Sequence, residues 1–211
     1  MDQILKKYSF FILQITIFLL AFTAILGKLI MLPATVLVFY RILIAVLGLL
    51  FFIFLFKKNQ KTTTKTAIKL ICIGFFVGAH WIFFFEAIKL SNVSIALICL
   101  ATSSLFASFL EPIILNRKIK LYEILISLLI ILSFVFMKET TSFKNFNYGL
   151  IIGLMSAFCA TIFTILNKTY INKINSVKIS LYEMVGGLMF TIFYFIVFTN
   201  YDYKDYLYIS R

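Results

Sequence analysis

The sequence predicts an all-α polytopic membrane protein with about seven transmembrane helices. Three observations support this: 63% of the 211 residues are hydrophobic, only 13% are charged, and the apolar residues form long continuous blocks. A soluble domain has about 25% charged residues, so lipid must solvate most of this chain. Continuous blocks also differ from the alternating strands of a membrane β-barrel. The blocks cover about 8–27, 33–56, 67–88, 93–115, 121–137, 148–167 and 178–199.

The net charge of +12 lies mainly in the short connections between these blocks. This placement is typical of membrane proteins and gives no indication of a nucleic-acid partner. Of the 20 Lys and Arg residues, thirteen fall at the N-terminus and in the 2–3, 4–5 and 6–7 connections, and six fall on the opposite side. The positive-inside rule therefore predicts a cytoplasmic N-terminus.

The first block follows Lys6 and Lys7 and carries Gln14. It is longer than the apolar core of a signal peptide, and no small-residue cleavage site follows it. We therefore predict that it is retained as the first span.

The second block contains Arg41, about 12 Å along the predicted helix from Pro33. An arginine near a helix centre costs about 2.5–3.5 kcal/mol to insert, and the many apolar residues around it offset that cost. Small residues at helical spacing (Ala34, Ala45 and Gly48) predict a face that packs against other helices and directs the guanidinium into the bundle. Two roles fit: a structural arginine bound to backbone carbonyls or a carboxylate, or direct contact with a substrate or coupling ion.

The third block contains His80, the only histidine of the chain. Gly74 and Gly78 lie four residues apart on a different face, together with Trp81, and predict a seam where another helix packs closely. His80 fits either a protonation site or substrate donor, or a side chain hydrogen-bonded to a neighbouring helix.

Small and hydroxyl residues recur at helical spacing in the fourth and sixth blocks. In the fourth block Ser104 and Ser108 belong to such a stripe, Thr102 lies beside it, and Glu111 lies at its cytoplasmic end. The stripe of the sixth block consists of Gly149, Gly153, Ser156, Ala160, Thr164 and Asn167. Most such stripes are packing seams, and a minority line a polar cavity.

The seventh block contains Glu183, which shares a helix face with Ser180, Gly186 and Gly187. A carboxylate on such a face is a candidate for a proton site or an intramembrane ion pair. The alternative is a hydrated carboxylate at the cytoplasmic interface, since Glu183 lies only five residues after Lys178.

The first two blocks resemble the sixth and seventh. LLAFTAIL matches MSAFCATI, and Tyr40-Arg41 aligns with Tyr182-Glu183. Each block and its match are separated by an odd number of crossings, so they run in opposite directions. Such an inverted repeat is common in secondary transporters, where the binding site lies near the bilayer midplane.

Three ordered segments carry a family resemblance: LPATVLVFYR, GFFVGAHWIFFFEAIKLSNVSIALICL and LFASFLEPIILNRKIKLYEILISLLIIL. In these the chain resembles the EamA-type transporters of the drug/metabolite transporter superfamily, which have ten helices in two inverted five-helix repeats. The resemblance implies a first repeat over 8–137 and a partial second repeat of two helices within 148–211. The chain departs from the family at Asn116-Arg117, where Gly-Glu is frequent, and in its length, because three further helices would be required.

The resemblance implies a bacterial inner-membrane carrier that works by alternating access without ATP, often an exporter of amino acids or related metabolites. We expect a cavity between the first, third, fourth and sixth spans, with charge supplied by His80, Glu183 or Arg41 and with protons as the natural coupling ion. The residues predicted to line it are Gln14, His80, Trp81, Phe84 and Thr102.

Other readings of the sequence stay open. The chain also fits a non-transporting receptor or scaffold, or a truncated carrier that is inactive alone or completed by a partner subunit or a second copy. The sequence contains no nucleophile–base pair, metal-ligand cluster or phosphate-binding loop, so neither an enzyme nor a cofactor is predicted.

Overall fold

The computed structural model describes residues 2–56, 62–118, 121–125, 129, 132 and 146–198. Its helices are α1 (Asp2–Leu29), α2 (Ala34–Phe56), α3 (Thr64–Leu90), α4 (Val93–Ala101), α5 (Ser103–Leu115), α7 (Phe146–Lys168) and α8 (Ser176–Phe198). Within the described residues, six helical segments are long and apolar enough to cross a membrane, with α4 and α5 counted as one. The protein is therefore an all-α polytopic membrane protein, as the sequence predicts.

Two predictions fall largely outside the described residues. Of the predicted fifth span, 121–137, the structure describes only residues 121–125, which are helical, and residues 129 and 132. The part of the predicted second repeat after residue 198 also lies outside them.

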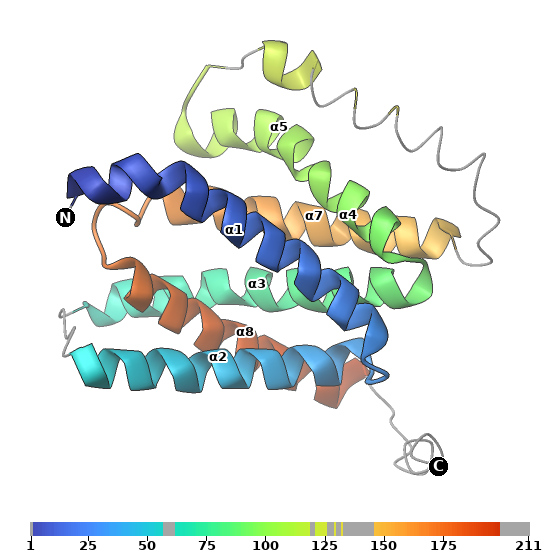
Figure 1. Cartoon of the computed structure of the whole chain (residues 1–211), viewed down its shortest axis with the longest axis horizontal. Coiled ribbons are helices and arrows are strands. Elements are labelled where there is room, and N and C mark those ends of the chain that lie inside the picture. Colours follow the sequence, from blue (N-terminus) through green and yellow to red (C-terminus); the bar gives the residue numbers. More distant parts are fainter. Residues whose placement is uncertain are drawn as a thin grey trace.

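Helix α3 lies in the middle of the bundle and packs against α2, α7 and α8 (Figure 1). Its side chains Ile82, Phe85 and Ile88 are almost completely buried, together with Val38 and Ile42 of α2. An apolar helix buried on several sides is expected at the centre of a membrane bundle, where close packing replaces the hydrophobic effect.

The predicted glycine seam is confirmed, and its partner is α8. A Cβ placed on Gly74 would lie 2.2 Å from the carbonyl oxygen of Glu183, and one on Gly78 would lie 2.8 Å from that of Gly187. A Cβ on Gly186 would lie 2.0 Å from the carbonyl oxygen of Ile71. The two backbones therefore cross in direct contact, which only glycine permits at these positions.

The fourth predicted span is one helix interrupted at Thr102. The Thr102 hydroxyl and its backbone N–H both donate to the carbonyl of Cys99, at 2.6 and 3.0 Å. A threonine that binds back to its own helix in this way bends it. In Figure 1, α5 continues from α4 toward the edge of the bundle, on the side away from α2.

One packing prediction for α2 is wrong. Gly48 was expected to pack against another helix on the small face of Arg41, but a Cβ at Gly48 would meet nothing within 4 Å. Ala34, at the start of that face, is buried. Ala45 on this face is half-buried and Gly48 is exposed, so the packing ends before Gly48.

Candidate functional site

Arg41 points into the bundle, as predicted, and lies against two aromatic rings of α3. The guanidinium carbon is 4.9 Å from the ring centroid of Trp81 and 4.7 Å from that of Phe85. Such cation–π contacts stabilise a desolvated cation without neutralising it. Among the described residues, neither a carboxylate nor a backbone carbonyl accepts a hydrogen bond from Arg41, so both forms of the predicted structural anchor are absent there. Within the described residues, the N–H donors of the Arg41 guanidinium therefore have no hydrogen-bond acceptor.

His80 is buried and hydrogen-bonded to α7. Its Nδ1 lies 3.1 Å from the carbonyl oxygen of Ser156 and 2.8 Å from the Ser156 hydroxyl, and that hydroxyl is 3.0 Å from the carbonyl of His80. A carbonyl oxygen only accepts hydrogen bonds. All three contacts are satisfied when Nδ1 of His80 carries the proton and the Ser156 hydroxyl donates to the carbonyl of His80. His80 therefore forms the hydrogen bonds to a neighbouring helix that one of its two predicted roles requires. The rings of Phe84 and Phe163 flank it, with centroids at 5.9 and 5.8 Å.

The structure brings together four of the seven predicted site residues. Arg41, His80, Trp81 and Phe84 form a cluster around the middle of α3, which we call the α3 cluster together with Phe85 and Ser156.

The other three predicted residues lie apart from this cluster. Gln14 is exposed on α1, where its face has no neighbour in the described bundle. Thr102 is buried at the break between α4 and α5. Glu183 lies beside Gly74, six residues or about 9 Å along α3 from His80.

Glu183 is buried inside the bundle. It is 6% exposed, and the Asn167 side chain of α7 interacts with its carboxyl group. One carboxyl oxygen of Glu183 and the side-chain oxygen of Asn167 are buried without a hydrogen-bond partner. Unpartnered buried oxygens are costly, so this pair favours an intramembrane proton or ion site over a hydrated carboxylate.

Parts of the predicted stripes line a groove between α5 and α7: Ser104 from the fourth block, and Ala160 and Thr164 from the sixth. Gly153 and Ser156 of the sixth-block stripe instead pack against Cys99 of α4 and His80 of α3. The groove has a volume of about 170 Å³. The lining residues are Ser103, Ser104, Ala107, Glu111, Ala160, Thr161, Thr164 and Ile165. Four hydroxyl residues and a carboxylate place polar groups in the otherwise apolar wall of this groove.

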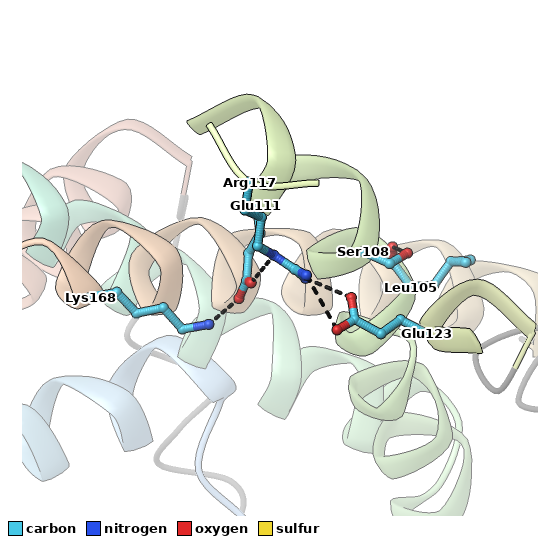
Figure 2. Close-up of polar contacts among 6 residues, drawn as sticks. All are labelled: Leu105, Ser108, Glu111, Arg117, Glu123 and Lys168. Carbon is cyan, nitrogen blue, oxygen red and sulfur yellow. Dashed lines mark hydrogen bonds and ion pairs between the residues drawn. The ribbon is translucent and has the colours of Figure 1, made fainter. Parts of the chain in front are cut away.

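An ion network closes one end of this groove (Figure 2). Glu111 accepts from Lys168, the last residue of α7, and its Oε2 lies 2.7 Å from Nε of Arg117. Arg117 also binds both carboxylate oxygens of Glu123, at 2.6 and 3.3 Å. The hydrogen bonds to Glu123 and the charge of Glu111 raise the pKa of the Arg117 guanidinium above its ordinary value. Asn116 provides the left-handed turn, with φ of 51°, that returns Arg117 toward Glu111.

Sequence reasoning missed Phe85 and the partners of Glu111. Phe85 lies four residues after Trp81, so helical spacing alone places both rings on one face. Lys168 lies one turn after Thr164 on its stripe, as Glu111 lies one turn after Ala107 on the facing helix. Extending both stripes by one turn reaches each of the two residues, but the stripes alone do not pair them.

Replacing Ser156 with alanine is expected to destabilise the protein by about 1 kcal/mol, because two hydrogen bonds to His80 are lost while the bond from Nδ1 to the backbone carbonyl remains. The measurement is reversible unfolding in detergent. Ser94→Ala on the exposed side of α4 is the control and should change stability little. Equal losses in both variants would contradict a specific role for the contact between His80 and Ser156.

Comparison with known proteins adds one match. A model of the EamA-like transporter family matches residues 7–138, which include most of α1 and all of α2 to α5, with Arg41, His80 and Glu111. No curated protein and no solved structure matches the chain.

Proposed function

This chain belongs to the EamA-like transporter family, and we propose on that premise that it is a secondary transporter that exports small organic metabolites such as amino acids. Transport would proceed by alternating access, without ATP and without a catalytic step. We further propose the bacterial inner membrane as its location, with the N-terminus in the cytoplasm.

The observation that carries this proposal is the α3 cluster. A guanidinium without an acceptor in the described part of the chain lies in the membrane interior against Trp81 and Phe85 of α3. The only histidine precedes Trp81 on the same helix and has aromatic neighbours of its own. Intramembrane charges are costly and mark substrate or ion pathways. Aromatic walls with a few polar groups are typical of small-molecule sites.

In the proposed mechanism, Arg41 binds a polar group of the solute, and the rings of Trp81 and Phe84 contact its apolar part. Glu183 and His80 carry the coupling proton: Glu183 has an unpartnered oxygen inside the bundle, and Nε2 of His80 has no hydrogen-bond partner among the described residues. Gln14 and Thr102 contribute to the path only if α1 and the α4–α5 break move toward α3. A second copy or a completing subunit is compatible with the broad apolar surface of the bundle.

The test is transport by the purified full chain in proteoliposomes loaded with a mixture of amino acids. We expect the wild type to accumulate at least one of them when a pH gradient is imposed and to exchange it without a gradient. A variant with both His80→Gln and Glu183→Gln should keep exchange and lose gradient-driven accumulation, because neither side chain then carries a proton.

Glu86→Gln, in a half-buried carboxylate near the other end of α3, is the matched control and should keep both activities. Full gradient-driven transport in the double variant would overturn the assignment of proton coupling. Absence of both accumulation and exchange for every solute in the wild type would overturn the proposal of transport itself.

A further inference from the structure

The α5–α7 groove has a contact between the two helices at each end. At one end the Thr161 hydroxyl of α7 donates to the carbonyl of Ser103 on α5, at 3.2 Å. At the other end Glu111 of α5 accepts from Lys168 of α7. The groove therefore has a cross-helix contact at each end and about 170 Å³ between them, which is room for a small solute, given that a water occupies about 30 Å³ of the liquid.

Two hydroxyl groups in the groove donate no hydrogen bond within the described part of the chain. Hydroxyls in membrane helices usually donate to a carbonyl one turn back, as Ser108 does to Leu105 and Thr161 does to Ala157. The side chains of Ser103 and Thr164 make no such bond in the described part of the chain, although both line the groove. These two hydroxyls can donate to a solute or accept from it.

In the ion network at the mouth of the groove, one cation, Lys168, can be replaced by another. Glu111 is only 12% exposed and has two cationic partners. Arg117 is held firmly, because it also forms a two-pronged bond with Glu123 (Figure 2). Lys168 is 50% exposed, and its ammonium contacts Glu111 alone among the described residues. The ammonium of Lys168 is the accessible member of the pair, and Glu111 keeps Arg117 as a partner when Lys168 leaves, so another ammonium can take its place.

We propose that the groove binds a solute through a protonated primary amine, which replaces Lys168 on Glu111 while the hydroxyls of Ser103 and Thr164 bind the rest of the polar surface. This inference rests on the proposed function and names a substrate class for it: small primary ammonium compounds. Release of Lys168 also removes its ion pair with Glu111 between the ends of α5 and α7.

The test is direct binding to the purified full chain, measured as the shift of its melting temperature during titration with butylammonium. The uncharged isostere butyramide is the ligand control. We expect saturable stabilisation by butylammonium and none by butyramide. Glu111→Gln should weaken butylammonium binding about tenfold or more, because the charge-assisted bond is lost.

Lys168→Met gives the opposite prediction. It removes the competitor and keeps Glu111 and the hydroxyls of Ser103 and Thr164, so butylammonium should bind about tenfold more tightly. Lys173→Met, in the exposed turn after α7, is the matched control and should leave binding unchanged. If Glu111→Gln does not fold, Lys168→Met still decides the outcome.

Equal stabilisation by butyramide, or unchanged or weaker butylammonium binding in Lys168→Met, would overturn the inference. The assay does not depend on translocation. Transport of uncharged or anionic solutes without butylammonium binding would therefore overturn the inference alone. Specific butylammonium binding without transport of any solute would overturn the proposed function and leave an ammonium-binding groove.

Discussion

Gly186→Ala is expected to lower the free energy of unfolding by about 2–3 kcal/mol. The new Cβ would lie 2.0 Å from the carbonyl oxygen of Ile71, and neither backbone can yield without separating α3 from α8. Overpacking of this kind costs about 1–3 kcal/mol, and here the contact is with backbone and not with a flexible side chain. Unfolding in detergent by added denaturant measures the effect.

Gly48→Ala is the matched control, because it makes the same change in another membrane helix where nothing lies within 4 Å. Removing a glycine from a helix interior is worth about 0.5–1 kcal/mol in favour of folding, so this variant should be equally stable or slightly more stable. A loss in Gly186→Ala no larger than in Gly48→Ala would show that the α3–α8 crossing is looser than described.

Arg41→Met is expected to fold and to lose transport by about tenfold or more, which corresponds to about 1.4 kcal/mol of binding free energy. Removing one partner of a buried ion pair normally leaves the other charge stranded. The described residues include no carboxylate paired with Arg41, so the methionine strands no charge, and its side chain can still pack against Trp81 and Phe85. The measurements are the melting temperature and solute exchange in proteoliposomes.

Two further variants test the role of Arg41 more closely. Arg41→Lys keeps the charge but loses the planar group that stacks on the rings, so we expect partial activity. Tyr40→Phe, on the exposed side of α2, should transport normally. Full exchange in Arg41→Met would remove Arg41 from the site, and failure of that variant to fold would make its aromatic contacts structural.

Residue spacing predicts those parts of the fold that depend on one helix at a time. The spans follow from continuous apolar runs, and the seam at Gly74 and Gly78 follows from their four-residue spacing. The inward direction of Arg41 follows in part from Ala34 on its face. The prediction fails at Gly48, because periodicity marks a face along the whole helix whereas the neighbouring helix covers only part of it.

The sequence alone did not predict which residues of distant segments contact one another. Glu111 and Lys168 are separated by 57 positions, and only the packing of α5 on α7 makes them partners. Gln14 was expected beside His80 in a cavity between the first, third, fourth and sixth spans, yet it is exposed on α1. The break at Thr102 has no glycine or proline to signal it, because the distortion comes from a hydroxyl that binds a carbonyl three residues back.

That break has a consequence for biosynthesis. Crossing the bilayer takes roughly 20 residues, and α4 has 9 residues and α5 has 13, whereas Val93–Leu115 together has 23. Neither half is long enough to be inserted by the translocon as a separate span. The nascent segment must therefore partition into lipid as one continuous helix. The bend at Thr102 needs no partner helix, because the bond from its hydroxyl to the carbonyl of Cys99 lies within this one inserted segment.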